Sequence, residues 1–341
     1  MLSEALVERI LACLPSKTVG VVGDLFLDRY LDIDAALTES SVETGLDAYQ
    51  VAGVRSFPGA LGTIINNLVA LGVGTILPFA IIGDDGEGHE LRQALARMPV
   101  VRADGVISWD GRRTPTYTKP MLCESGKTPR ELNRLDIKNR TPTPNEALTA
   151  VRACLQKELA SLDALIVLDQ VSEADCGVIA APLRDWLNDI GLSQPTRFIL
   201  ADSRNRIGLF RNVHIKPNTT ECLRATGLPP DRWAQALRQL GDQTKRAVFC
   251  TRGEDGLAVF RPGETEILSV RGYPVDGPID IVGAGDSCGA GIVCATVAGA
   301  DALEAAAFGN LVASITVQQL GVTGTASPEQ VRRRWREVAP S

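Results

Sequence analysis

A glycine-rich stretch, Asp280-Ile-Val-Gly-Ala-Gly-Asp-Ser-Cys-Gly-Ala-Gly291, carries residues that could do chemistry. Gly283, Ala284 and Gly285 precede a run of small and apolar residues that predicts a buried helix, so their amides would lie at its amino terminus. Free amides and the positive end of the helix dipole bind anions such as phosphate. Asp286 would then be a base that takes the proton of an attacking hydroxyl. The alternative is a glycine-rich helix start that Asp286 caps.

Two further groups of polar residues follow predicted strands. Asp24 and Asp28 come directly after the apolar run 18–23, at the kind of strand end where open α/β sheets bind ligands. Their carboxylates could accept hydrogen bonds from sugar hydroxyls, or Asp24 could cap a turn and Asp28 could be solvated. Asn218 and Glu221 have the spacing of a capping box, and the same spacing suits Mg²⁺ binding that is partly mediated by water.

The segment 102–140 is basic in an acidic chain. It contains nine Lys and Arg residues against five Asp and Glu residues, whereas the whole chain has a net charge of −6. Local positive charge favours an anionic substrate. For most of these residues taken singly, a solvated face remains the alternative interpretation.

Alternating strands and helices must position these residues. Apolar runs predict strands at 18–23, 75–82, 164–169, 197–201 and 246–251, and longer runs predict helices at 58–71, 142–159, 174–188 and 301–320. Repeated β–α units of this length predict an α/β fold with a parallel, doubly wound sheet. Residues 31–57 have no helical period and predict the strands of a small β lid. Gly72 is expected to end the helix that begins at Pro58.

The composition argues against several classes of function. With 41 Asp and Glu against 35 Lys and Arg, the chain lacks the basic footprint of a general nucleic-acid binder. The eight cysteines form no Cys-x-x-Cys pair or zinc spacing and are expected to be reduced thiols. Residues 1–15 predict a surface helix rather than an export signal, and no apolar run reaches membrane-spanning length. We therefore expect a cytoplasmic protein that binds neither nucleic acid nor membrane.

At these residues the chain resembles the ribokinase-like (PfkB) family of sugar kinases. The segment 280–287 is similar almost residue for residue to the carboxyl-terminal signature of that family, and the resemblance extends from Val19 to about Ser327. It implies a doubly wound, mainly parallel sheet flanked by helices, with a small β-sheet lid. It also implies that Asp286 is the catalytic base and that the amides of residues 283–285 form the anion hole for the transferring phosphoryl group.

Within this family the chain looks most like the kinase domain of bacterial heptose 7-phosphate kinases. The segments that carry this resemblance are 23–30, 114–119 and 133–136. This resemblance, together with the position of Asp24 at the end of a predicted strand, implies the residues that bind the acceptor. They are Asp24, Asp28, Gly59, Thr63 and Lys119. Lys119 is expected at the end that holds the sugar phosphate. Ala60 departs from the second glycine of the family pattern, and Thr63 departs from an asparagine that contacts the sugar.

The resemblance also implies a nucleotide site. The residues expected to bind ATP are Asn218, Thr251, Gly253, Gly256 and Asn310. Glu221, with Asn218 acting through water, is the expected Mg²⁺ ligand, because the two match a Pro-Asn-x-x-Glu element of the family. Asn310 is expected to contact the adenine from the last long helix.

We therefore predict one kinase domain over residues 1–341, with a lid from residues 31–57 and 103–121, and a homodimer formed through the lid. The predicted reaction is transfer of the γ-phosphoryl group of ATP to a hydroxyl of a heptose 7-phosphate. The alternatives are a kinase for a different, unphosphorylated sugar and a non-catalytic sugar or nucleotide sensor on the same fold. An NAD-dependent enzyme is disfavoured, because no Gly-x-Gly-x-x-Gly follows the first strand. We expect no nucleotidyltransferase-like second domain.

Overall fold

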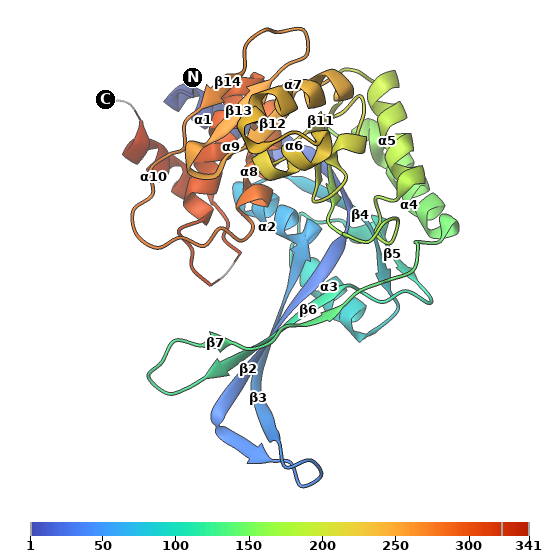
Figure 1. The fold of residues 1–341 in the computed structure, drawn as a ribbon, viewed down its shortest axis with the longest axis vertical. Coiled ribbons are helices and arrows are strands. Elements are labelled where there is room, and N and C mark those ends of the chain that lie inside the picture. Colours follow the sequence, from blue (N-terminus) through green and yellow to red (C-terminus); the bar gives the residue numbers. More distant parts are fainter. Residues whose placement is uncertain (1, 322, 340–341) are drawn as a thin grey trace.

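The computed structural model describes residues 2–321 and 323–339. Their strands form a large and a small β-sheet (Figure 1). In this part of the chain the large sheet has nine strands in the order β14-β13-β12-β11-β10-β9-β1-β4-β5. Its strands are β1 (Thr18–Gly23), β4 (Thr75–Gly83), β5 (Val106–Trp109), β9 (Ala164–Asp169), β10 (Phe198–Ser203), β11 (His214–Ile215), β12 (Val248–Thr251), β13 (Leu257–Phe260) and β14 (Leu268–Val270). The strands from β12 to β5 are parallel to one another, and β13 pairs antiparallel with both of its neighbours, β12 and β14. The predicted doubly wound, mainly parallel sheet is therefore confirmed.

Each face of the large sheet has its own hydrophobic core, because successive side chains of a strand point to opposite faces. In β1, Val19 and Val21 belong to one buried cluster and Val22 belongs to the other. In β4, Ile76 and Leu77 divide in the same way. Buried apolar strands with helices on both faces are typical of parallel sheets.

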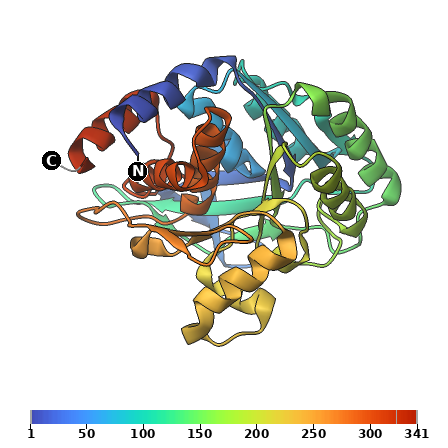
Figure 2. The same cartoon turned by 90° about the horizontal axis from the view of Figure 1, so that it is seen from above.

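Two groups of helices cover these cores. One face is covered by α1 (Glu4–Cys13), α2 (Leu61–Leu71), α3 (Gly86–Ala96), α8 (Ala284–Val297), α9 (Ala302–Thr316) and α10 (Pro328–Val338). The other is covered by α4 (Asn145–Glu158), α5 (Ala181–Ser193), α6 (Thr219–Thr226) and α7 (Trp233–Thr244). Helices α1 and α10 lie side by side (Figure 2), joined by a bidentate ion pair between Arg332 and Glu8. Among the described residues, no helix has the length and apolar character needed to cross a bilayer.

The small sheet is built around two long strands. Its strands are β2 (Leu25–Ser40), β3 (Asp47–Ala60), β6 (Thr116–Cys123), β7 (Arg130–Glu131) and β8 (Leu135–Ile137). Strand β2 is antiparallel to β3 and parallel to β6, and the β2–β3 hairpin extends away from the body (Figure 1). Of the predicted lid segment 103–121, only residues from 116 onward join this sheet, because Val106–Trp109 pairs with β4 in the large sheet.

The predicted helix at 58–71 begins three residues later than expected. Residues 58–60 continue β3, and Ala60 pairs with Leu25 of β2, so the helix starts at Leu61. It ends at Gly72, whose φ of 92° is left-handed, as expected for a glycine after the last turn.

The carboxyl ends of β1, β9, β10, β11 and β12 meet at one edge of the large sheet, because these strands are parallel. Strand β2 begins directly after β1, so the small sheet starts at the same edge. Ligands of open α/β sheets bind at this edge. The fold therefore brings the small sheet next to the loops that follow these strands.

Candidate active site

The glycine-rich loop lies at the amino terminus of α8, as the sequence predicts. Gly283 is the N-cap with a φ of 79°, a left-handed conformation that glycine adopts without strain. Space also requires glycine here, since a Cβ atom would lie 2.5 Å from Cγ2 of Thr323 and 3.2 Å from Cγ2 of Thr63. Thr63 of the predicted acceptor set is therefore a direct neighbour of the loop.

Asp286 is in the first turn of α8 and does not cap the helix, since no side chain caps this end. Burial and, after it, the nearby Asp202 carboxylate raise the pKa of the Asp286 carboxyl to about 7, against the opposing effects of Lys216 and Arg204. A carboxyl with a pKa near neutrality can exchange protons with a substrate at physiological pH. The position therefore suits a general base.

A lysine that sequence reasoning missed lies beside this loop. Lys216 follows β11, and the parallel register places it opposite Asp202 at the end of β10. The Lys216 Nζ is 2.6 Å from Asp202 Oδ2 and 3.4 Å from the position of a Cβ atom on Gly285. Burial lowers the pKa of this lysine, but the Asp202 carboxylate outweighs that effect and raises it, so the lysine is charged. A buried cation thus lies next to the predicted anion hole.

Asp28 and Gly59 lie together on neighbouring strands of the small sheet. A Cβ atom on Gly59 would be only 2.5 Å from Oδ2 of Asp28, so glycine leaves the room that this carboxylate occupies. Burial raises the pKa of Asp28, against the attraction of Lys119 and Arg134. The carboxylate is thus half-buried between cations and suits hydrogen bonds from hydroxyl groups.

Asp24, in contrast, has a structural role. It is 3% exposed, and its carboxylate accepts hydrogen bonds from the amides of Gln170 (2.8 Å), Val171 (2.9 Å) and Val178 (2.7 Å). Burial and the nearby Asp169 raise its pKa to about 6, while these amides act in the opposite direction. The geometry therefore favours the turn-capping alternative, in which Asp24 holds the loop after β9.

Lys119 is bound to an aromatic residue of the neighbouring strand. Its Nζ donates a 3.0 Å hydrogen bond to the Tyr30 hydroxyl and lies 4.8 Å from the centroid of that ring. Burial lowers the pKa of Lys119, but Tyr30 and Asp28 raise it above its ordinary value. Lys119 therefore belongs to the same half-buried group as Asp28.

Asn218 and Glu221 form the capping box of α6. The Asn218 side chain accepts from the Glu221 amide, and the Glu221 carboxylate accepts from the Asn218 amide, both at 2.8 Å. Burial and the nearby Asp202 raise the pKa of Glu221. A divalent cation would reduce the repulsion between the Glu221 and Asp202 carboxylates. The described residues contain no group of three or more His, Cys, Asp or Glu side chains that could hold a metal ion.

The remaining predicted nucleotide residues lie in two places. Thr251 forms a parallel bridge with Asn218, and its amide donates to the Pro217 carbonyl at 2.9 Å. Gly253 and Gly256 follow in the next turn with φ values of 60° and 85°. Asn310 donates to the Arg271 carbonyl at 2.8 Å, so its side chain supports the loop after β14. The structure thus joins Thr251 to the Asn218–Glu221 pair.

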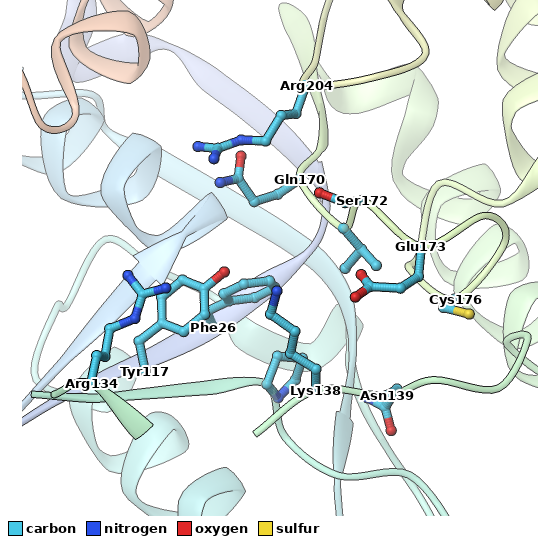
Figure 3. Close-up of a pocket in the computed structure, with 12 residues that line it drawn as sticks. Phe26, Tyr117, Arg134, Lys138, Asn139, Gln170, Ser172, Glu173, Cys176 and Arg204 are labelled. Carbon is cyan, nitrogen blue, oxygen red and sulfur yellow. The ribbon is translucent and has the colours of Figure 1, made fainter. Parts of the chain in front are cut away.

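A polar cavity of about 140 Å³ lies between the small sheet and the loop after β9. It is lined by Phe26, Pro115, Tyr117, Arg134, Lys138, Asn139, Gln170, Val171, Ser172, Glu173, Cys176 and Arg204. Figure 3 shows Arg204 and Gln170 on one side and Tyr117, Arg134 and Lys138 on the other. A second cavity of about 90 Å³ lies on the same sheet and is lined by Asp28, Tyr30, Arg55, Phe57, Pro58, Asn66 and Thr323.

Sequence reasoning assigned no role to Arg204, to Tyr117 of β6, or to the lining residues that flank β8, which are Arg134, Lys138 and Asn139. The basic character of 102–140 pointed to this region without indicating which cations face a cavity. Arg204 lines the 140 Å³ cavity. Its positive charge also lowers the pKa of Asp286, Glu221 and Tyr117.

Comparison with known proteins identifies the family. Residues 32–330 match the pfkB family of carbohydrate kinases. The chain is 27% identical to the bifunctional protein HldE of Gluconacetobacter diazotrophicus and 29% identical to that of Azotobacter vinelandii, and these alignments cover 93% and 92% of this chain. The chain spans 63% of the length of each of these relatives.

Solved structures share the fold. A ribokinase of Arabidopsis thaliana complexed with ribose and ATP aligns with a TM-score of 0.66 at 19% identity, covering 95% of this chain and 99% of that one. A putative ribokinase II of E. coli in complex with ATP and Mg²⁺ aligns with a TM-score of 0.65 at 18% identity, covering 94% and 99%. At these identities the likeness establishes a ribokinase-like fold.

Proposed function

The chain belongs to the pfkB family of carbohydrate kinases, and we propose that it transfers the γ-phosphoryl group of ATP to a hydroxyl of a heptose 7-phosphate. Membership makes it a phosphotransferase with an alcohol group as acceptor. The observation that carries the proposed chemistry is the half-buried Asp286 carboxyl, with a pKa of about 7, in the first turn of α8.

In the proposed reaction Asp286 takes the proton of the acceptor hydroxyl as its oxygen attacks the γ-phosphorus. The bond between that phosphorus and the β–γ bridging oxygen breaks, and ADP leaves. The amides of Gly283, Ala284 and Gly285, with the Lys216 ammonium beside them, stabilise the negative charge on the transferring group. Such catalysis consists mainly of positioning and charge stabilisation.

The nucleotide would lie along the loops after β11 and β12. Thr251, Gly253 and Gly256 would contact its phosphates and ribose, and Asn310 its adenine. Mg²⁺ would be held by Glu221 and, through water, by Asn218, and it would neutralise phosphate charge. The support for this arrangement is the bridge between Thr251 and Asn218 together with the raised pKa of Glu221.

The acceptor would lie between the small sheet and the glycine-rich loop. Asp28 would accept hydrogen bonds from its hydroxyls, Gly59 would leave room for that carboxylate, and Thr63 would contact the sugar beside Gly283. Lys119 would keep this group positively charged. A phosphorylated acceptor is supported by the positive charge of residues 102–140 and by the resemblance of 114–119 and 133–136 to heptose 7-phosphate kinases.

The test is an ADP-release assay with ATP and Mg²⁺ against free sugars, hexose phosphates and seven-carbon sugar phosphates. We expect turnover with a heptose 7-phosphate and a second phosphate ester in the ³¹P NMR spectrum of the product. Turnover only with a free sugar would contradict the proposed acceptor and keep the kinase. If the protein binds ATP without turnover on any sugar, it is a sensor rather than an enzyme.

A further inference from the structure

We propose that the phosphate of the acceptor binds to Arg134 and Lys138 in the 140 Å³ cavity, rather than to Lys119. This inference rests on the proposed function and deepens it, because it names the residues that distinguish a sugar phosphate from a free sugar. The cavity lies where β6 and β8 meet the loop after β9. Its volume is larger than that of a phosphate group, and its lining includes three cationic side chains.

Arg134 is held in place by its neighbours. Its guanidinium lies 4.0 Å from the centroid of the Tyr117 ring and donates to both oxygens of Asp136, at 2.6 and 2.9 Å. These two bonds use Nε and one Nη2 hydrogen, so the Nη1 hydrogens are available to a ligand. A fixed, planar guanidinium is well suited to bind phosphate through two hydrogen bonds.

Lys138 supplies a positive charge that, among residues 2–321 and 323–339, is not held in an ion pair. Its Nζ lies 6.0 Å from the Tyr117 centroid, and within the described part of the chain it has no carboxylate partner at ion-pair distance. Arg204, on the opposite side, likewise has none among these residues. Arg134 is paired with Asp136. The lining then has two further cations, Lys138 and Arg204, against one carboxylate, Glu173. This excess of positive charge favours an anionic group.

Glu173 adds an acceptor for hydroxyl groups to the same cavity. Its Oε2 is buried and has no hydrogen-bond partner among the described residues, and Arg140 lies 3.8 Å from its Oε1. Figure 3 shows the Glu173 and Lys138 side chains pointing toward one another across the cavity. A buried carboxylate oxygen without a donor is costly, and the hydroxyl of a sugar would supply one. The cavity therefore fits a molecule that carries both a phosphate and hydroxyls.

Lys119 is less well placed to bind the phosphate. Its ammonium donates to the Tyr30 hydroxyl, and within the described residues it lines neither of the two cavities. Its charge acts on Asp28. Its role in this arrangement is to keep Tyr30 and Asp28 in position.

The experiment compares steady-state kinetics of Lys138→Met and Arg134→Met with wild type, using D-glycero-D-manno-heptose 7-phosphate, ATP and Mg²⁺. Loss of a charge-assisted contact should raise the KM for the sugar phosphate about 10- to 100-fold. The KM for ATP and kcat should change less than about twofold. A variant with a structural defect would change these two constants as well. Arg134→Lys should recover part of the affinity, because it keeps the charge and loses the fork.

Two further variants, Lys127→Met and Lys119→Met, complete the experiment. Lys127→Met removes an exposed cation of the same basic segment, paired with Glu124, and should leave every constant unchanged. Lys138→Met guards against misfolding, since Lys138, unlike Arg134, has no ion pair to lose. If Lys119→Met raises the KM for the sugar phosphate while both cavity variants behave like wild type, the cavity is not the phosphate site. If wild type phosphorylates only free sugars, the proposed acceptor fails and this inference fails with it.

Discussion

Lys216 and Asp202 form an ion pair of 2.6 Å at the carboxyl ends of neighbouring parallel strands, directly beside the glycine-rich loop. The pair connects the sheet to the site. Asp202 raises the pKa of Asp286 and of Glu221, while Lys216 lowers both. The ion pair therefore affects the pKa of the proposed base, Asp286, and of the proposed Mg²⁺ ligand, Glu221, together.

Replacing Lys216 by Met should reduce kcat about 10²- to 10³-fold, because a buried cation next to the transferring phosphoryl group is lost. It should also lower the free energy of unfolding by about 3–5 kcal/mol, since the Asp202 carboxylate is left without its partner. Both are measured by ADP release and urea denaturation. The matched control is Lys17→Met, which breaks the more exposed pair with Asp163. It should cost under about 1 kcal/mol and leave kcat unchanged; equal effects of the two variants would contradict the role of Lys216.

The raised pKa of Asp286 predicts a pH dependence of both rate and stability. A general base must be deprotonated to act, so kcat/KM should fall below an apparent pKa near 7, the value for Asp286. For stability, the folded-state pKa of about 7 lies above the ordinary value of 3.8, so the native state binds more protons between these values. The free energy of unfolding should therefore decrease as pH rises from about 4 to 7 because of this group.

Asp286→Asn should remove that dependence. At pH 8 the variant should be more stable than wild type by on the order of 2 kcal/mol, and at pH 4 the two should agree. Urea denaturation at both pH values measures the difference. If the difference in free energy of unfolding between the two proteins is the same at both pH values, burial does not raise the pKa of Asp286.

Gly59→Ala should impair acceptor binding, because the added Cβ would lie 2.5 Å from the Asp28 carboxylate and displace it. We expect the KM for the acceptor to rise at least about 10-fold, in line with a lost charged hydrogen bond, with the KM for ATP unchanged. Ala60→Gly is the adjacent control. Ala60 has a φ of 50°, so glycine relieves strain there and should stabilise the fold by about 1 kcal/mol. A normal acceptor KM in Gly59→Ala would remove Asp28 from the site.

The β2–β3 hairpin is the expected dimer interface. It exposes apolar side chains at Val42, Leu46, Tyr49, Val51 and Val54, and patches of this kind often mark sites of association. Val54→Asp should shift the mass measured by light scattering from dimer to monomer. Leu192→Asp, an equally exposed apolar position on α5, should leave the mass unchanged. A monomeric wild type would contradict the interface.

Local signals in the sequence were enough to predict part of this site. The conformation of Gly283 and the position of Asp286 depend on residues that are adjacent in the chain, and the same holds for the end of α2 at Gly72. The two-sided sheet also follows from a local pattern, since β1 and β4 are apolar on both faces.

Other features of the site depend on strand register and on which distant groups bind a given side chain, and neither can be seen in a local stretch of sequence. Lys216 and Asp202 become neighbours only through the pairing of β10 with β11. Asp24 and Asp28 have similar positions in the sequence, yet three amides of a loop more than 140 residues away bind Asp24 and leave Asp28 for the site. The position of β5 was missed because the pairing of Val106–Trp109 with β4 is not visible in its four residues.

The proposed role of Asp286 is tested most directly by comparing wild type with Asp286→Asn, using a saturating sugar phosphate that wild type turns over and measuring both turnover and the Kd of ATP. We predict that kcat falls about 10²- to 10⁴-fold, as expected for loss of a general base, while the Kd of ATP changes little. If Asp286→Asn keeps a kcat within about threefold of wild type, the base is another residue and the assigned chemistry of the glycine-rich loop is wrong.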